Sequence, residues 1–566
     1  MGIEGFGSYI QRYFRDCTSP KKPKNIASLF IDANGIFYKA TAKVVPQDGD
    51  EKELDKLREL NKEQIENKII KASVKILEDM ITQFKPKDNL ILAIDGVANA
   101  AKMNQQKTRR YKKETSIDKI FNTRCFTPGT EMMVKLDRAF TEVIKKIVNI
   151  RKVIYSSHLV PGEAEHKIFD LIRANKIILS SDNHILHGDD GDLLIIPLLS
   201  PIKNIYVYRE NISLFHSVDK LKGLIKNKLK NRSEEIILCQ DFALLSFFIG
   251  NDFLPRFPNL PNTVGTMDIM IRVYNRVDKD MTNSMGDIIW ENFYHLINCM
   301  DKWKRNDYGL YENNFIRPLA FPLKVLHESV TLTDEKGKKV KETYDSSRHT
   351  INFDLPAFAE KWYNKQFAPK EKKLAQMYSG EEYFTTRDIT KMVIKFLQTF
   401  QWVLKYYLIG PEKVPNSFFY PYNYTPLSIS VINYLKLLLR EKKVHHLDKV
   451  LELRNYSFHA AHQLLMVLPP FSIDLIPVEF HTVYKTALNA LSPTDYPDPI
   501  AENTDKEHMA KPIIPPINPL LTFNSCRDYT LPSHLQLVST LIVNNQMNEN
   551  QSNSIEDFTI DETILL

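Results

Sequence analysis

The chain has few cysteines, and this shortage excludes two kinds of site. Only Cys17, Cys125, Cys239, Cys299 and Cys526 occur among 566 residues. They are odd in number, widely separated and never spaced as CxxC, so the sequence predicts neither a disulfide framework nor a zinc knuckle. This usage is typical of a reducing compartment, and we expect a cytoplasmic protein.

Long apolar runs are also missing. No stretch reaches the roughly 20 apolar residues needed to cross a bilayer. The start MGIEGFGSYI lacks the basic and apolar regions of a secretion signal. Hydrophobic residues still make up 43% of the chain, enough for one large core or two to three ordinary ones. We expect a soluble, globular monomer.

Charge is present in both signs and nearly balanced. The net charge of +6 comes from 75 Lys and Arg against 69 Asp and Glu, which predicts a mixed, solvated surface. Two segments differ from this average. Residues 101–113 carry six basic residues and no acid, and residues 544–566 carry five acids and no base.

Short apolar runs alternate with helical periodicity through the first 255 residues. This pattern predicts an α/β domain with a mostly parallel, twisted sheet flanked by helices. A crossover helix is predicted between the first two strands, because apolar residues from Ile70 to Phe84 recur at helical spacing. Residues 236–255 indicate a buried helix that breaks at Gly250. The predicted strands are 28–35, 89–96, 152–160, 184–192 and 204–209.

The remaining chain divides by composition. After an N-terminal domain at residues 1–266, the sequence becomes polar and shows no regular pattern. An exposed loop is expected at 333–343. A mostly helical block rich in aromatic residues follows and is expected to pack on the first domain. The predicted parts are an irregular connecting segment at 267–350, this second block at 351–500, a Pro-rich extended segment at 501–540 and a disordered acidic tail at 541–566.

Acidic residues follow the predicted strands and the buried helix. Because the ligand crevice of an open α/β sheet lies at the carboxyl ends of its strands, we expect these acids to meet. Any one of them alone is more simply a solvated loop residue, a cap or a turn former. Five separate segments that all end in acids favour a site. The candidates are Asp32, Asp95, Glu163, Glu165, Asp190, Asp192 and Asp252.

Such a cluster predicts bound cations. Two carboxylates about 4 Å apart repel by about 4 kcal/mol at an effective dielectric of 20. Ligands that are all oxygen suit a hard divalent ion, so we expect two Mg²⁺ ions, with Mn²⁺ able to replace them. Such a pair can hydrolyse a phosphodiester. Glu163 and Glu165 would diverge by about 200° on a regular helix, so the Pro161-Gly162 turn is needed to aim both at the ions.

A basic helix is predicted directly after Asp95. Lys102, Gln106, Arg109 and Arg110 fall on one face of it and can form a pocket for a phosphate. The alternative is a solvated basic face, but this stretch contains no acid to pair with. A nuclease that holds a 5′ phosphate here and cuts at a fixed distance would release mononucleotides and would exclude capped or triphosphorylated ends.

Several longer motifs resemble the XRN family of eukaryotic 5′→3′ exoribonucleases, within the wider group of flap-endonuclease-like (PIN-like) 5′ nucleases. The resemblance covers about residues 1–500, and we expect a compact member without further C-terminal domains. The matching text is IDANGIFY, AIDGVANAAKMNQQKTRRYKK, FTPGTEMM, LVPGEAEHKI, GDDGDL and FFIGNDFLP, followed by QWVLKYYLIG, SFFYPYNYTPLS, HQLLMVLPP and SPTDYPD.

The resemblance implies an Mg²⁺-dependent exoribonuclease that degrades 5′-monophosphorylated single-stranded RNA in RNA decay. The seven acids fall on the metal-binding positions of the family, and the four residues of the basic helix on its 5′-phosphate pocket. Tyr38 and Phe418 stand where the family stacks the leading bases on a histidine and a tryptophan, a contact worth about 1–3 kcal/mol per base. Core packing is the alternative for both. Asn99-Ala100 and Asp189 depart from the family pattern without touching a predicted ligand.

Two other functions are compatible with the same residues. The metal chemistry also serves a DNA-directed 5′ nuclease or flap endonuclease, although the second aromatic block argues against it. An inactive RNA-binding homologue is disfavoured because it has no need of mutually repelling carboxylates. Protein partners such as decay factors stay open.

Overall fold

The computed structural model places most of the chain. The described residues are 2–3, 5–45, 55, 57–112, 120–230, 233–257, 260, 263–305, 330–333, 339–340, 350–353, 359–360, 362–364, 384–494, 514–536, 539–545 and 554–559.

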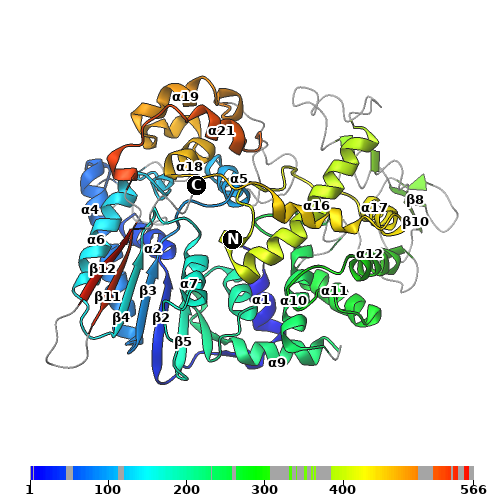
Figure 1. Cartoon of the computed structure of the whole chain (residues 1–566), viewed down its shortest axis with the longest axis horizontal. Coiled ribbons are helices and arrows are strands. Elements are labelled where there is room, and N and C mark those ends of the chain that lie inside the picture. Colours follow the sequence, from blue (N-terminus) through cyan, green and yellow to red (C-terminus); the bar gives the residue numbers. More distant parts are fainter. Residues whose placement is uncertain are drawn as a thin grey trace.

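A mixed sheet forms the frame of the first domain (Figure 1). Its strands are β1 (Thr18–Ser19), β2 (Ile26–Asp32), β3 (Asn89–Ala93), β4 (Lys152–Ser156), β5 (Asn183–His187), β6 (Ile205–Arg209), β7 (Leu214–Ser217), β11 (Ser539–Asn544) and β12 (Ser554–Thr559). Their order is β1-β7-β6-β5-β2-β3-β4-β11-β12. The five central strands, β6 to β4, are parallel and are the five that the sequence predicts. The outer strands pair antiparallel, so the predicted α/β fold class is confirmed and extended at both edges.

Helices cover both faces of this sheet (Figure 1). Alternate strand residues face opposite sides, as the period of a strand requires. Leu29 and Ile31 of β2 pack against α2 (Asn34–Val44), α4 (Lys62–Phe84) and α6 (Glu131–Lys145), whereas Phe30 belongs to the core on the other side. That second core contains α1 (Phe6–Tyr13), α7 (Ala164–Arg173), α8 (Ile195–Leu198), α9 (Val218–Lys228) and α10 (Glu235–Ser246).

The second block is helical. Its first two helices continue the core that contains α10, and the other two form a third core with Val97, Ala100 and Met103. Its helices are α16 (Thr386–Ile409), α17 (Ser428–Arg440), α18 (Ala460–Val467) and α19 (His481–Lys485). A capping box between Thr385 and Asp388 starts α16. Trp402 and Phe400 of α16 are fully buried in one cluster with Phe247 and Phe248, which follow α10. The predicted packing of an aromatic-rich helical block on the sheet domain is confirmed.

The expectation of an irregular segment at 267–350 is wrong for its first part. Helix α11 (Thr263–Val277) crosses the predicted boundary, and α12 (Trp290–Arg305) follows it. Met267, Met270 and Tyr274 are fully buried, so the helical period was present but interrupted by polar residues. Farther on, β8 (Val330–Thr333), β9 (Lys339–Val340) and β10 (Thr350–Phe353) form a small sheet, and most of the predicted loop at 333–343 lies outside the described residues.

The expectations for the C-terminal region are also corrected. Strand β11 pairs with β4, and β12 pairs with β11, where the sequence predicts an extended segment and a disordered tail. Helix α21 (Pro519–Ser525) lies within the predicted Pro-rich segment. Leu541 and Val543 enter the core on one face of the sheet and Ile542 the core on the other. This three-residue apolar run is outweighed in the sequence by the polar residues around it.

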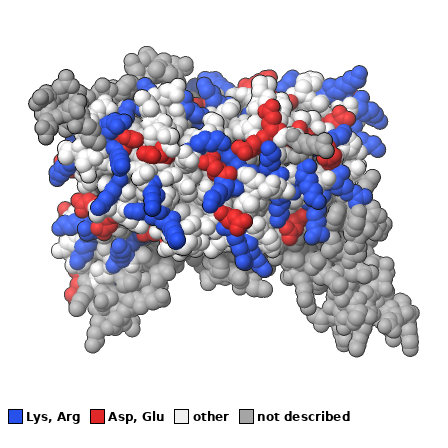
Figure 2. All heavy atoms as spheres, turned by 90° about the horizontal axis from the view of Figure 1, so that it is seen from below, with Lys and Arg blue, Asp and Glu red and all other residues white. Residues whose placement is uncertain are grey.

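Surface charge is mixed, as the composition predicts. On the face seen from below, Lys and Arg side chains are interspersed with Asp and Glu (Figure 2). Within the part of the chain that the structure describes, no helix has both the length and the apolar character needed to cross a membrane.

Strand β11 should contribute strongly to stability. Ile542 is 6% exposed, and its truncation to Ala should lower the free energy of unfolding by about 2–4 kcal/mol, because it leaves a cavity. Urea unfolding followed by circular dichroism measures the loss. Val478→Ala is the control, since Val478 is 73% exposed and should change stability by less than about 0.5 kcal/mol. Equal small effects of both substitutions would contradict the pairing of β11 with β4.

Candidate active site

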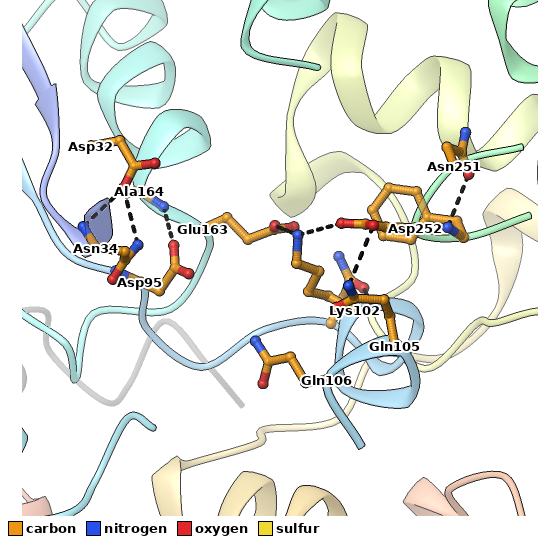
Figure 3. Close-up of polar contacts among 12 residues, drawn as sticks. Asp32, Asn34, Asp95, Lys102, Gln105, Gln106, Glu163, Ala164, Asn251 and Asp252 are labelled. Carbon is orange, nitrogen blue, oxygen red and sulfur yellow. Dashed lines mark hydrogen bonds and ion pairs between the residues drawn. The ribbon is translucent and has the colours of Figure 1, made fainter. Parts of the chain in front are cut away.

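Two aspartates at the carboxyl ends of β2 and β3 meet through an asparagine (Figure 3). Asp32 accepts hydrogen bonds from the backbone N–H and the side-chain Nδ2 of Asn34, each at 3.1 Å. The Asn34 Oδ1 accepts from the backbone N–H of Asp95 at 3.2 Å. Asn34 therefore fixes the two acids relative to each other. The sequence contains it in IDANG, but nothing in that motif distinguishes it from a turn residue.

The loop after Asp95 is joined to the turn that precedes α7. Gly96 N–H donates to the Gly162 carbonyl at 2.9 Å, and Gly162 N–H donates to the Val97 carbonyl at 2.8 Å. A Cβ atom at Gly96 would lie 1.7 Å from the Val160 carbonyl oxygen, so only glycine allows this approach. The two backbone bonds bring the loop that carries Asp95 against the turn that carries Glu163.

The start of α7 supplies the two glutamates. Glu163 is the N-cap residue and Glu165 lies in the first turn, where the helix dipole favours negative charge. Asp95 accepts from the backbone N–H of Ala164 at 2.9 Å and so caps the same helix end. Lys167 shapes the preceding turn by donating to the Ser157 carbonyl at 2.8 Å. The predicted role of the Pro161-Gly162 turn in placing both glutamates is consistent with this arrangement.

Lys102 connects the glutamates to the last predicted acid (Figure 3). Its ammonium forms an ion pair with Glu163 and lies 2.9 Å from Asp252 Oδ2, and its side chain is only 12% exposed. Gln105 Nε2 donates to Asp252 Oδ1 at 3.3 Å. Both residues belong to α5 (Ala100–Arg110), so this helix is tied to the acids. The sequence predicts a phosphate-binding role for Lys102, and in this structure its partners are carboxylates.

Tyr406 of α16 is a residue of the site that the sequence did not reveal. Its hydroxyl donates to Glu163 Oε1. The ring stacks on Trp402 and lies 4.0 Å from that of His166, centroid to centroid. The second block thus contributes directly to the carboxylate cluster, a contact across 243 positions of sequence that no local pattern signals.

Burial and mutual repulsion raise the pKa values of Asp32, Glu163 and Glu165. The pKa of Asp190 is lowered despite its burial, because positive charges that include Lys102 and Arg109 lie near it. Burial, together with the charges of Asp95 and Asp190, raises the pKa of Asp32 to about 8. Burial and the neighbouring Glu163 hold the pKa of Glu165 well above its usual value. Burial also raises the pKa of Glu163, although the Lys102 ammonium opposes this. Asp32, Asp95, Asp190, Glu163 and Glu165 thus lie close enough to interact electrostatically, and their role as metal ligands stays a prediction.

The loop after β5 carries Asp190, and three residues hold this loop through four contacts to Asp189. Arg209 donates to the Asp189 carbonyl from Nε at 3.2 Å and from Nη2 at 2.9 Å. Lys39 Nζ lies 2.9 Å from Asp189 Oδ2, and the Asn211 N–H donates to Oδ1 at 3.0 Å. The departure at position 189 therefore makes an ion pair next to Asp190. Asp192 lies in the helical turn η3 (Gly191–Leu194), and its side chain is outside the described residues.

The other predicted phosphate-binding residues lie on α5 in different surroundings. Arg109 Nη2 donates to the Tyr38 hydroxyl at 3.3 Å and interacts electrostatically with Asp252, Asp190 and Asp95. Gln106 is 6% exposed and accepts a hydrogen bond from Gln463 at 2.8 Å. Arg110 is buried and donates to the Phe126 carbonyl at 3.2 Å. Arg109 thus faces the acids, whereas Arg110 also supports the fold.

The two predicted stacking residues differ in exposure. Tyr38 is 40% exposed on α2, beside Arg109, and its ring packs edge-on against Phe126. Phe418 is 2% exposed, and the Lys395 ammonium lies 4.6 Å from its ring centroid. The structure therefore leaves Tyr38 available for stacking, and it corrects the expectation for Phe418 to core packing.

The carboxylates fit a hard divalent ion by chemistry. All are oxygen donors, and the raised pKa values of Asp32, Glu163 and Glu165 indicate that added positive charge would stabilise these three in their ionised form. Among the side chains that the structure describes, no three His, Cys, Asp or Glu residues are arranged closely enough to hold an ion as they stand. Lys102 instead supplies the positive charge between Glu163 and Asp252.

The chain is similar in sequence to known exonucleases. Residues 1–211 match the family model described as XRN 5'-3' exonuclease N-terminus, and residues 232–304 match the Xrn1 helical domain. The chain is 25% identical to human 5'-3' exoribonuclease 1 over 84% of its own length, and 30% identical to the Schizosaccharomyces pombe protein of that name over 49%. These matches cover 31% and 24% of the two relatives, so the chain spans less than a third of either.

One solved structure gives a partial match to this chain. The catalytic core of Rad2 in complex with DNA substrate is 14% identical, with a TM-score of 0.32, and the match covers 56% of this chain and 77% of that one.

The raised pKa of Asp32 predicts a pH-dependent stability without divalent ions. The unfolded carboxyl ionises near 3.8 and the folded one near 8, so between these values the folded state binds more protons and rising pH favours unfolding. Between pH 5 and pH 8, in a chelating buffer, the wild type should lose more stability than Asp32→Asn. Urea midpoints measure this, with Asp182→Asn on an exposed loop as control. Parallel pH profiles for the wild type and Asp32→Asn would contradict the assignment.

Proposed function

Because the chain belongs to the XRN family of 5'-3' exonucleases, we propose that it is a divalent-metal-dependent 5′→3′ exoribonuclease. It removes mononucleotides from single-stranded RNA that carries a 5′-monophosphate. This activity contributes to RNA decay in the cytoplasm. The chain acts as a monomer.

One observation carries this proposal: a cationic helix lies directly against a cluster of acids. Lys102 of α5 forms ion pairs with Glu163 at the start of α7 and with Asp252 after α10, and Arg109 of α5 interacts electrostatically with Asp252, Asp190 and Asp95. A nuclease needs positive charge to bind the phosphates and acids to hold the ions. In this site the positive charge of Lys102 and the acids Glu163 and Asp252 are in direct contact.

The acids are the residues that would hold the ions. Mg²⁺ is the expected ion, with Mn²⁺ as a substitute. When bound, such ions activate a water molecule and stabilise the leaving oxygen of the phosphodiester. The chain contributes by orienting the ligands: Asn34 holds Asp32 and Asp95, and Tyr406 holds Glu163. The ligand set is Asp32, Asp95, Glu163, Glu165, Asp190, Asp192 and Asp252.

The cationic side supports binding of the RNA 5′ end. Arg109 offers a planar guanidinium that suits a terminal phosphate, with Lys102 and Gln106 on the same helix face. Tyr38 stands next to Arg109 with 40% of its surface exposed, which suits stacking of the first base. Arg110 completes the basic set from its buried position beside Phe126.

The purified chain should digest 5′-monophosphorylated RNA to mononucleotides in the presence of Mg²⁺. A triphosphorylated RNA of the same sequence should stay intact, since the proposed phosphate site is expected to accept only the smaller end, and a chelator should abolish digestion. Asp190→Ala should lower kcat by at least about 1000-fold while RNA binding is kept, because the site loses a metal ligand. Product analysis by thin-layer chromatography and a filter-binding assay measure the two effects.

Three outcomes would count against the proposal. Equal digestion of both RNA ends would refute the phosphate pocket. Preferred cleavage of a DNA flap would favour a DNA-directed 5′ nuclease. Unchanged turnover by Asp190→Ala, or tight RNA binding without any turnover by the wild type, would favour an RNA-binding protein without this activity.

Arg109→Ala should mainly remove end selectivity. The loss of a guanidinium that binds the terminal phosphate should raise KM for 5′-monophosphorylated RNA about tenfold or more and leave 5′-hydroxyl RNA unaffected. Steady-state kinetics on the two RNAs measure the ratio. Arg440→Ala, at the exposed end of α17, is the matched control. An equal loss on both RNAs would show that Arg109 supports the fold instead.

A further inference from the structure

A fully buried glutamine of α18 contacts two parts of the site at once. Helix α18 packs against α5, and Gln463 has 0% of its surface exposed. Its Oε1 accepts a hydrogen bond from the backbone N–H of Ala98 at 3.0 Å. Its Nε2 donates to Oε1 of Gln106 at 2.8 Å. Both ends of this amide are therefore used, one by the loop before α5 and one by α5 itself.

The backbone group at Ala98 decides which way both amides face. A backbone N–H can only donate, so Gln463 must present its oxygen to Ala98. Its NH₂ group then points to Gln106, whose side-chain oxygen must accept the hydrogen bond. Reversing either amide would place two donors or two acceptors face to face in a buried position, and the lost hydrogen bonds would lower stability. The orientation of Gln106 follows from a group that cannot reverse.

The remaining end of Gln106 is a hydrogen-bond donor. Its amide nitrogen points toward the cluster of acids and Lys102 (Figure 3). Within the described part of the chain, no hydrogen bond from this nitrogen is found. Gln106 lies between Lys102 and Arg109 along α5, so a neutral donor is placed between two cations.

We propose that Gln463 is a positioning residue that fixes Gln106 with its NH₂ group toward the 5′-terminal phosphate of the substrate. The inference rests on the proposed function, because it assigns the anion that this donor meets. Without Gln463 the Gln106 amide is free to turn its oxygen toward the phosphate, and an oxygen repels an anion. Gln463 thereby lets the second block act on the selection of the RNA end.

A double-mutant cycle tests whether Gln463 acts through Gln106. The variants are Gln463→Met, Gln106→Met and the double substitution, assayed on 5′-monophosphorylated RNA and on its 5′-hydroxyl twin. Gln463→Met should raise KM for the phosphorylated RNA about threefold to tenfold, the range expected when a hydrogen bond to a charged group is weakened. The value of kcat and the kinetics on 5′-hydroxyl RNA should change less than twofold. In the Gln106→Met background, Gln463→Met should have no further effect on KM.

Gln401→Met is the matched control. Gln401 is also 0% exposed and also uses both ends of its amide, but its two partners are backbone groups, the Ile288 N–H at 2.8 Å and the Gly286 carbonyl at 3.0 Å. It contacts no residue of α5 among these partners. Its replacement should lower the melting temperature as Gln463→Met does and leave the KM ratio of the two RNAs at the wild-type value.

Gln463→Glu keeps the test decisive if the methionine variant does not fold. Glutamate retains the acceptor for Ala98, and at pH 9 its ionised carboxylate can only accept. Gln106 must then donate to it and turn its oxygen to the phosphate. KM for phosphorylated RNA should rise at least tenfold at this pH, whereas Gln401→Glu should keep the wild-type KM.

The outcomes separate this inference from the function on which it rests. A wild type that digests both RNAs equally would overturn the proposed function. A wild type that prefers the phosphorylated RNA, with additive effects of Gln463→Met and Gln106→Met or an unchanged KM in Gln463→Glu, would overturn the role of Gln463 alone.

Discussion

Repulsion among buried carboxylates is the constraint on which this structure depends. Asp32, Asp95 and the two glutamates of α7 are brought together by the parallel strands and by the backbone bonds between Gly96 and Gly162. Burial, and then their proximity, raises the pKa values of Asp32 and Glu165, which costs stability wherever they ionise. A fold without a use for these charges would gain by losing them. The arrangement makes physical sense as a binding site for positive charge, which Lys102 provides in part.

The second block contributes side chains that contact residues of the site, in addition to packing against the sheet domain. The long-range contacts run from α16 to Glu163 and from α18 to Gln106. One continuous hydrophobic core connects α16 with α10 and with the sheet. A change in this block can therefore alter the orientation of a carboxylate and, if the proposed function holds, the binding of the RNA 5′ end.

The sequence predicts those features of the site that are local. Short apolar runs predicted the five parallel strands correctly. The acids that follow four of these strands predicted that Asp32, Asp95, Glu163, Glu165 and Asp190 lie near one another, because each acid is close in sequence to the strand that positions it. Asn34, Tyr406 and Gln463 were missed, because their partners are set by tertiary packing. Phe418 was wrongly predicted to be an exposed stacking residue, because the presence of an aromatic residue in a matching motif does not tell whether that residue is buried. Strand β11 was missed because its three apolar residues depend on an edge of the sheet that forms far away in sequence.

Binding of a divalent ion tests the central claim most directly. Calorimetric titration of Mn²⁺ into the purified chain at pH 7, in two buffers of different ionisation enthalpy, reports both the affinity and the protons released. We expect saturable binding with release of protons, because the carboxylates that ionise on binding include Asp32, whose pKa is about 8. Binding should be lost in the Asp95→Asn, Glu165→Gln double variant. Absent binding by the wild type, or equal binding by the double variant, would contradict the account.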